Sequence, residues 1–191
     1  RIAVELNKIV LSPVPSVGFD LLERTGLLEL IFPEMQRLKG IERRGQHAHK
    51  DNFYHTLKVL DNVAAVSDDL WLRWAAILHD IGKPKTRRFE AGGKVSFHRH
   101  DAVGAKMTRK RLKALHFDHH MVEDVSELVN LHLRFHGYVE EPWTDSAVRR
   151  YVKDAGPLYE RLNRLTRADT TTQNKRKAMM FSTAMDEMEQ R

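Results

Sequence analysis

The sequence predicts an all-α fold. Apolar residues recur at helical spacing through most of the chain, and Pro, Gly and capping residues separate these stretches. No series of alternating apolar and polar residues is present that could build a sheet. With 41% hydrophobic and 30% charged residues, the chain has the composition of a globular protein, and its 191 residues suit one domain or one domain with a small appendage.

The N-terminal segment is predicted to hold short helices. Residues 1–11 place four apolar side chains on one helical face, namely Ile2, Leu6, Ile9 and Val10. After Pro13 and Pro15, a short helix capped by Ser16 is predicted through Leu22, and the apolar run at 27–31 is predicted to end at Pro33. Residues 36–50 are predicted to form an exposed connection because they are rich in Gly and in the basic residues Arg37, Lys39, Arg43, Arg44 and Lys50.

Two helices are predicted to follow, at 51–66 and from about residue 70. The first has an apolar stripe of Phe53, Leu57, Leu60 and Ala64. The second is predicted to be capped by Asp68 and Asp69, and it is apolar nearly all round, which places it at the centre of the core. Gly82 and Pro84 are predicted to stop it.

The rest of the chain is predicted to be helical after one short interruption. Residues 86–97 have Gly92 and Gly93 at their middle, which favours a small hairpin or an ordered loop. Helices are then expected at about 99–115, 119–134, 145–154, 158–168 and 170–189. Asp118 and Thr144 are candidate caps, and Pro157 suits a first turn.

Eleven His residues stand out, and their positions matter more than their number. His79 and Asp80 end the most apolar helix, where Gly82 lets the chain turn so that both side chains can meet one ion. A carboxylate in such a place is unfavourable unless it is paired or binds metal, although the two residues could instead face water. If the two central helices are antiparallel, His55 lies beside them. Asp169, between two predicted helices, completes a pattern that predicts a divalent metal site.

This pattern resembles the HD superfamily of metal-dependent phosphohydrolases. The matching stretches are Tyr54-His55-Thr56, Leu78-His79-Asp80-Ile81-Gly82-Lys83-Pro84 and the distant Asp169. More narrowly, the chain is similar to the C-terminal part of bacterial CCA-adding tRNA nucleotidyltransferases and poly(A) polymerases. That similarity extends to residues 1–35, through Ser12-Pro13, Thr25-Gly26-Leu27-Leu28 and Ile31-Phe32-Pro33-Glu34.

The resemblance implies an HD-domain helical bundle at 46–191 and an RNA-side helical segment at 1–45. It further implies that His55, His79, Asp80 and Asp169 hold one ion, and that Asp80 bridges to a second ion on His100 and His132. The latter two could instead lie on ordinary polar helix faces, and His132-Leu133 stands where some two-metal relatives have paired His. The family's nucleotide-adding head, with its Gly-rich loop and paired Asp residues, has no counterpart in this sequence.

The expected chemistry is hydrolysis of a phosphate ester or nucleotide. Because the sequence has no Cys, any ion must be held by nitrogen and oxygen, which suits Mn²⁺, Fe²⁺, Co²⁺, Ni²⁺ or Mg²⁺. Such an ion lowers the pKa of a bound water and takes up charge on phosphate oxygens. Asp80 and Lys83 are the candidate catalytic residues. Lys83, Arg87 and His98 are candidate substrate contacts, and the alternative for Arg87 is a solvated basic loop.

The second hypothesis is a non-catalytic tRNA-binding module whose metal is structural or idle. A net charge of +6 favours a phosphate-bearing partner, or it reflects a merely basic surface. Three basic runs, at 106–113, 161–167 and 175–177, are solvated faces by default but add to the expectation of RNA contact. The longest apolar run is too short to span a membrane, and the absence of Cys suits the cytoplasm. The oligomeric state is not predicted. The chain begins at Arg1 without an initiator Met, so we expect it to be a piece of a longer protein.

Overall fold

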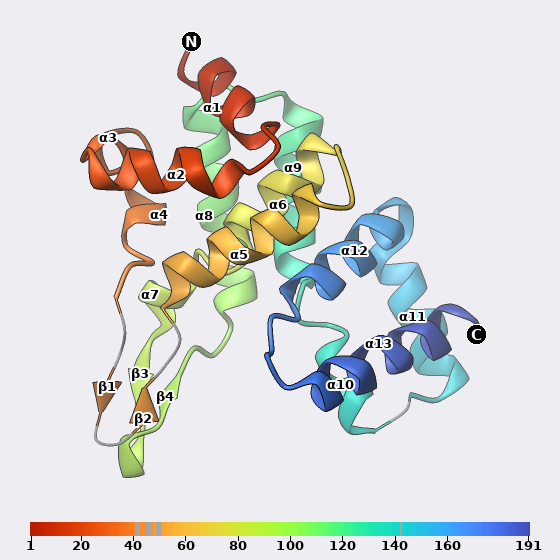
Figure 1. Cartoon of the computed structure of the whole chain (residues 1–191). Helices are drawn as coiled ribbons and strands as arrows, with labels where there is room; N and C mark the ends of the chain where they lie inside the picture. Colours follow the sequence, from red (N-terminus) through yellow and green to blue (C-terminus); the bar gives the residue numbers. More distant parts are fainter. Residues whose placement is uncertain (41–42, 45–46, 49–50, 142) are drawn as a thin grey trace.

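The computed structural model describes residues 1–40, 43–44, 47–48, 51–141 and 143–191, and most of them are helical (Figure 1). The all-α prediction is confirmed, with two-residue strands as the only extended elements in the described ranges. Among the helices described, none is long and apolar enough to cross a membrane.

Four short helices form the N-terminal segment, α1 (Ile2–Val10), α2 (Pro15–Arg24), α3 (Leu27–Ile31) and α4 (Pro33–Gln36). The predicted Ser16 cap is wrong, because Pro15 already lies inside α2 and Ser16 therefore occupies its first turn. The backbone N–H of Ser16 donates instead to the Asp61 carboxylate at 3.1 Å. This bond ties α2 to a helix 45 residues further along the chain.

A small hairpin follows α4 in the segment predicted as an exposed connection. Its strands β1 (Arg43–Arg44) and β2 (His47–Ala48) pair antiparallel. Strands of two residues are too short to show any periodicity, so the sequence did not predict them. The predicted boundary between residues 45 and 46, like Gly45 and Lys50 of the basic connection, falls outside the described residues.

The centre of the fold is built from α5 (Asn52–Ala64), α6 (Leu70–Leu78), α8 (His100–Ala114) and α9 (His119–Leu131). Helix α6 packs between α5 and α9, and its residues from Leu72 to Leu78 are all buried, which confirms its predicted central position. Asp69 caps α6 by accepting from Trp71 and Leu72. Asp68 does not cap it, because its carboxylate pairs with Arg73.

The hairpin expected near 86–97 is confirmed. After α7 (Lys83–Thr86), strand β3 (Arg88–Phe89) pairs antiparallel with β4 (Val95–Ser96), and the 3-10 turn η1 (Ala91–Gly93) joins them. Gly92 and Gly93 both have positive φ, which explains why this turn uses glycine.

The C-terminal part comprises α10 (His136–Glu140), α11 (Asp145–Ala155), the 3-10 turn η2 (Gly156–Leu158), α12 (Tyr159–Asp169) and α13 (Lys175–Glu189). Helix α12 packs on α5 and α6 (Figure 1). Two predicted bounds are corrected here. The last helix begins at Lys175 rather than residue 170, because Asn174 caps it, and Asp169 is the last residue of α12 rather than a residue between two helices.

One continuous hydrophobic core runs from Leu6 in α1 to Met188 in α13. Inside it lies a charged side chain that the sequence did not single out, Arg73 of α6, which is 2% exposed. Its guanidinium donates to four backbone carbonyls near the C-terminal ends of α1 and α5, those of Val10, Ser12, Ala64 and Ser67. Arg73 therefore joins the N-terminal segment to the central helices.

Candidate metal centre

Six predicted ligand side chains come from five helix ends that meet in the interior. Helix α5 brings His55 in its first turn, α6 ends at His79 and Asp80, and α12 ends at Asp169. The other two come from the first residue of α8 and the residue that caps α9, His100 and His132. His79 and Asp80 are almost fully buried, with 0% and 2% exposure.

The first ligand group comprises His55, His79 and Asp169. Asp169 Oδ1 lies 2.8 Å from His55 Nε2 and 3.4 Å from His79 Nε2. Two ligands bound to one ion at 2.0–2.2 Å are at most about 4.4 Å apart. These separations therefore fit a shared ion without moving a helix.

Asp80 faces both ligand groups through its two oxygens. Its Oδ2 lies 3.4 Å from His79 Nε2 and 3.7 Å from His55 Nε2. Its Oδ1 lies 3.3 Å from His100 Nε2 and 3.9 Å from His132 Nε2, in the second ligand group. A carboxylate placed in this way can bridge two ions.

Backbone carbonyls orient three of the four imidazoles. The Nδ1 atoms of His79, His100 and His132 lie 2.7, 2.9 and 2.6 Å from the carbonyl oxygen three residues earlier in the chain. A carbonyl only accepts, so each Nδ1 must carry a proton, and in the neutral imidazole that binds metal each Nε2 then presents its lone pair. These three Nε2 atoms are buried and have no hydrogen-bond partner among the described residues. Buried imidazole nitrogens gathered around a carboxylate are ligands that suit a divalent ion.

The protonation of the centre shows that its charges are coupled. Burial disfavours the charged form of His79, but the carboxylates of Asp80 and Asp169 outweigh burial and raise the pKa of this imidazole to about 10. Burial raises the pKa of each carboxyl, yet the charge of His79 holds the pKa of both Asp80 and Asp169 well below the usual range. Burial, with the neighbouring His79, lowers the pKa of His132 to about 4.

Gly82 lies against the backbone of α8, beside the metal centre. The sequence suggested that this glycine lets the chain turn, but its φ of −77° is open to any residue. The space around it is the reason for glycine, since a Cβ at Gly82 would lie 2.2 Å from the carbonyl oxygen of His100 and 2.7 Å from the nitrogen of Gly104. The turn after α6 thus packs directly on the backbone of α8, which carries His100.

Comparison with known families accounts for this arrangement. The family model described as the HD domain matches residues 52–173, which is more than half of the chain and includes all six predicted ligand residues. The chain belongs to the HD domain family. A second model, described as the probable RNA and SrmB-binding site of polymerase A, matches residues 1–39, so α1 to α4 form a recognised unit ahead of the HD domain.

Several curated relatives match most of the chain. The chain is 37% identical over 172 residues to an A-adding tRNA nucleotidyltransferase of Deinococcus radiodurans, covering 88% of this chain and 38% of the relative. It is 40% identical over 142 residues to a CC-adding tRNA nucleotidyltransferase of Thermus thermophilus, covering 70% of this chain and 31% of the relative. A multifunctional CCA protein of Pasteurella multocida is 32% identical over 136 residues, covering 67% of this chain and 31% of the relative. The chain thus spans about a third of the length of these relatives.

The predicted substrate contacts are divided between the HD centre and its surroundings. Lys83 is close, with its Nζ 2.7 Å from Asp80 Oδ2 and 5.6 Å from the centre of the Phe97 ring. Arg87 is exposed and lies over the Phe89 ring at 5.4 Å, and His98 is exposed. Neither Arg87 nor His98 belongs to the two ligand groups found among the described residues.

Two residues that support the first ligand group were missed by the sequence reasoning. Thr171 places its hydroxyl 3.2 Å from Nδ1 of His55, and this contact orients the one imidazole that no backbone carbonyl holds. Asn62 donates to the carbonyl of Ala168 at 2.9 Å and so fixes the end of α12 beside α5. Both contacts join residues more than 100 positions apart, and no local motif announces them.

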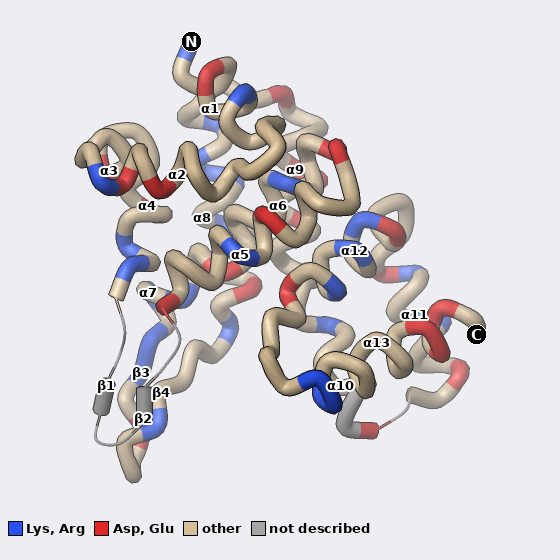
Figure 2. The backbone as a smooth tube through the Cα atoms, viewed as in Figure 1, with Lys and Arg blue, Asp and Glu red and all other residues tan. Residues whose placement is uncertain are grey.

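Arginines of two predicted basic faces, at 106–113 and 161–167, are paired with carboxylates in the folded chain. Arg109 pairs with Glu123, and Arg111 pairs with Glu34 at 2.8 Å. The arginines of α12 are paired likewise, as Arg161–Asp69, Arg164–Glu160 and Arg167–Asp186. Figure 2 shows a stretch of unmixed positive charge at the start of α13, where Lys175, Arg176 and Lys177 follow one another. Within the described residues, none of these three forms an ion pair, so they remain available to an anionic partner.

Proposed function

We propose that this HD domain is a divalent-metal-dependent phosphohydrolase acting on a phosphomonoester, a 2′,3′-cyclic phosphate or a nucleotide phosphodiester. The observation that carries the proposal is the set of three buried Nε2 atoms, of His79, His100 and His132, left without hydrogen-bond partners around the Asp80 carboxylate. Leaving such groups unpaired in a core is unfavourable by about 1–3 kcal/mol each, and ligation of an ion would remove that penalty.

The proposed division of roles follows the distances. His55, His79, Asp169 and Oδ2 of Asp80 would hold one ion, and His100, His132 and Oδ1 of Asp80 a second. A divalent ion there supplies a water of lowered pKa and offsets charge on the phosphate oxygens. Lys83 is 20% exposed at its side chain and its Nζ lies 2.7 Å from Asp80 Oδ2, so its ammonium would be close to a phosphate bound at the centre.

The test combines metal analysis with a rate measurement. The purified chain is loaded with Mn²⁺, Co²⁺ or Ni²⁺, bound metal is counted, and hydrolysis of bis-p-nitrophenyl phosphate and 2′,3′-cyclic AMP is followed. We expect Asp80→Ala to lose bound metal and at least about 100-fold in rate, because it removes the one ligand shared by both groups. Asp101→Ala is the control, since this carboxylate lies one residue after His100 and belongs to neither group. Equal, negligible rates for the native chain and Asp80→Ala would refute the hydrolase.

A tRNA-binding module is the second candidate, favoured by the match of residues 1–39 to an RNA-binding family and by the names of the relatives. Under this proposal, residues 1–45 form the RNA-side unit and residues 46–191 the HD unit, and the metal only stabilises the fold. We then expect the native chain and Asp80→Ala to bind tRNA equally well, and neither protein to hydrolyse the phosphate esters. A chain that does not bind tRNA would exclude it.

A further inference from the structure

A separate cavity lies between the end of α9 and α11, and none of the predicted metal ligands lines it. The imidazole of His132 points into the centre, whereas the flanking Leu131 and Arg134 line the cavity. Its volume of about 140 Å³ is smaller than the roughly 300–1,000 Å³ of pockets for drug-sized ligands, so it can take a group the size of a nucleobase but not a whole nucleotide.

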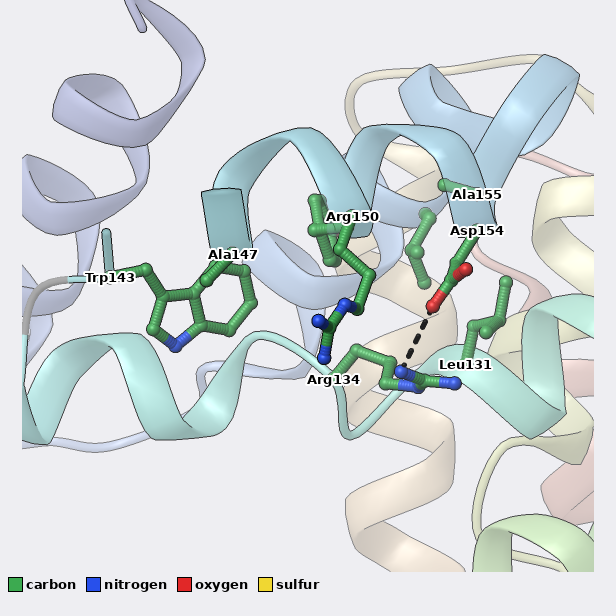
Figure 3. Close-up of a pocket in the computed structure, with 9 residues that line it drawn as sticks. Leu131, Arg134, Trp143, Ala147, Arg150, Asp154 and Ala155 are labelled. Atoms are coloured by element: carbon green, nitrogen blue, oxygen red, sulfur yellow. Dashed lines mark hydrogen bonds and ion pairs between the residues drawn. The ribbon is translucent and has the colours of Figure 1, made fainter. Parts of the chain in front are cut away.

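The mouth of the cavity carries excess positive charge. Figure 3 shows Arg150 extending from α11 across the opening toward Arg134. Arg134 has a partner in Asp154, at 3.1 Å. Arg150 has no hydrogen bond or ion pair with any described residue. Two arginines and one carboxylate leave a net charge of +1 at the mouth, which an anion bound to Arg150 would offset.

The aromatic side chain of Trp143 lines the same cavity as these arginines. The indole of Trp143 lines the cavity and is held by three other rings, with centroid distances of 5.3 Å to Tyr138, 5.4 Å to Tyr151 and 6.0 Å to Phe135. Tyr151 is itself fixed, since its hydroxyl donates to Asn163 at 2.7 Å. A ring held in this way offers a stacking surface that needs no ordering when a ligand binds.

We infer that this cavity binds a nucleotide, with the base in the cavity against Trp143 and the phosphate outside it, on Arg150. A fixed indole beside an unpaired guanidinium is the combination that recognises a base and its phosphate, since stacking and charge act on adjacent parts of one ligand. The ligand is either a free mononucleotide or one nucleotide of an RNA strand. The inference goes beyond the proposed function because it uses none of the metal ligands.

The experiment titrates the full chain in EDTA with AMP, adenosine, inorganic phosphate and a short oligoadenylate, by calorimetry. EDTA removes metal from the HD centre, so binding there does not contribute. Arg150→Gln is expected to weaken AMP binding about tenfold or more, because a charged hydrogen bond to phosphate is lost. Arg149→Gln is the matched control, the neighbouring exposed arginine of α11 that does not line the cavity, and it should change binding less than about twofold.

A third variant, Trp143→Leu, tests whether the base stacks on the indole, and circular dichroism checks that this variant is folded. Loss of AMP binding in both Arg150→Gln and Trp143→Leu supports a free nucleotide. The same pattern seen only with oligoadenylate supports a nucleotide within an RNA strand. The inference is overturned if neither ligand saturates, if Arg149→Gln weakens binding as much as Arg150→Gln, or if phosphate alone binds as tightly as AMP.

Discussion

Arg73 provides the sharpest test of how this fold is held together. Its guanidinium makes five hydrogen bonds, four to backbone carbonyls and one to Asp68. The Asp68 side chain is fully exposed, so that bond contributes little. Replacing Arg73 with Met keeps much of the side-chain volume but leaves the four carbonyls without their donor.

The expected cost follows from those four bonds. At about 1 kcal/mol each, with partial rescue by water at the less buried carbonyls, Arg73→Met should lower the free energy of unfolding by about 3–4 kcal/mol. That is a large share of the 5–15 kcal/mol typical of a native domain, and it corresponds to a fall in Tm of the order of 10 °C. Urea and thermal unfolding followed by far-ultraviolet circular dichroism measure both quantities.

Arg109→Met is the matched control for Arg73→Met. Arg109 also makes several hydrogen bonds, but all go to Glu123, and both side chains are more than a third exposed. An exposed ion pair contributes about 0–1 kcal/mol, so this variant should be nearly as stable as the native chain. A loss below about 1 kcal/mol for Arg73→Met, no larger than that of the control, would refute the role given to the buried guanidinium.

Three further predictions concern the HD centre and the C-terminal helices. Gly82→Ala should cost about 1–3 kcal/mol in urea unfolding and reduce the bound metal, because the new Cβ would meet the His100 carbonyl at 2.2 Å; an unchanged stability would contradict this packing. Tyr151→Phe should cost about 1–2 kcal/mol, since it leaves Asn163 Oδ1 without its buried donor. Burial raises the pKa of Tyr151 above the unfolded value of about 10. The contribution of this hydroxyl to the free energy of unfolding is therefore present below pH 10 and is lost as the pH rises further. Between pH 10 and 11, the native chain should lose more stability than Tyr151→Phe. Chelation of metal should lower the Tm. Reloading with metal near pH 7.5 should release protons to the buffer, because His79, with its pKa of about 10, must give up a proton to act as a ligand. Calorimetry in two buffers of different ionisation enthalpy measures this release, and equal binding enthalpies in the two buffers would contradict it.

Most of the helices could be predicted from helical periodicity and from the spacing of polar residues. The helices at 52–64, 70–78, 100–114 and 119–131 were predicted within a few residues, because each depends on local patterns of apolar side chains and caps. Ser16, Asp68 and the start of the last helix were mispredicted, since several residues near a helix start can cap it and only the surrounding contacts select one. Two-residue strands such as β1 and β2 leave no pattern to find.

The sequence by itself determined which residues are candidates for the metal centre, because the HD pattern joins His55, the His79-Asp80 pair and Asp169 in an otherwise apolar, helical chain. Only the tertiary structure decided how they are used. The division of the Asp80 oxygens between two ligand groups depends on where helices distant in the sequence end relative to one another. The fit of Gly82 against α8 and the burial of Arg73 under the carbonyls of α1 depend on the same packing. Spacing along a chain specifies local faces, whereas distances between helix ends are set by the side chains that pack between them.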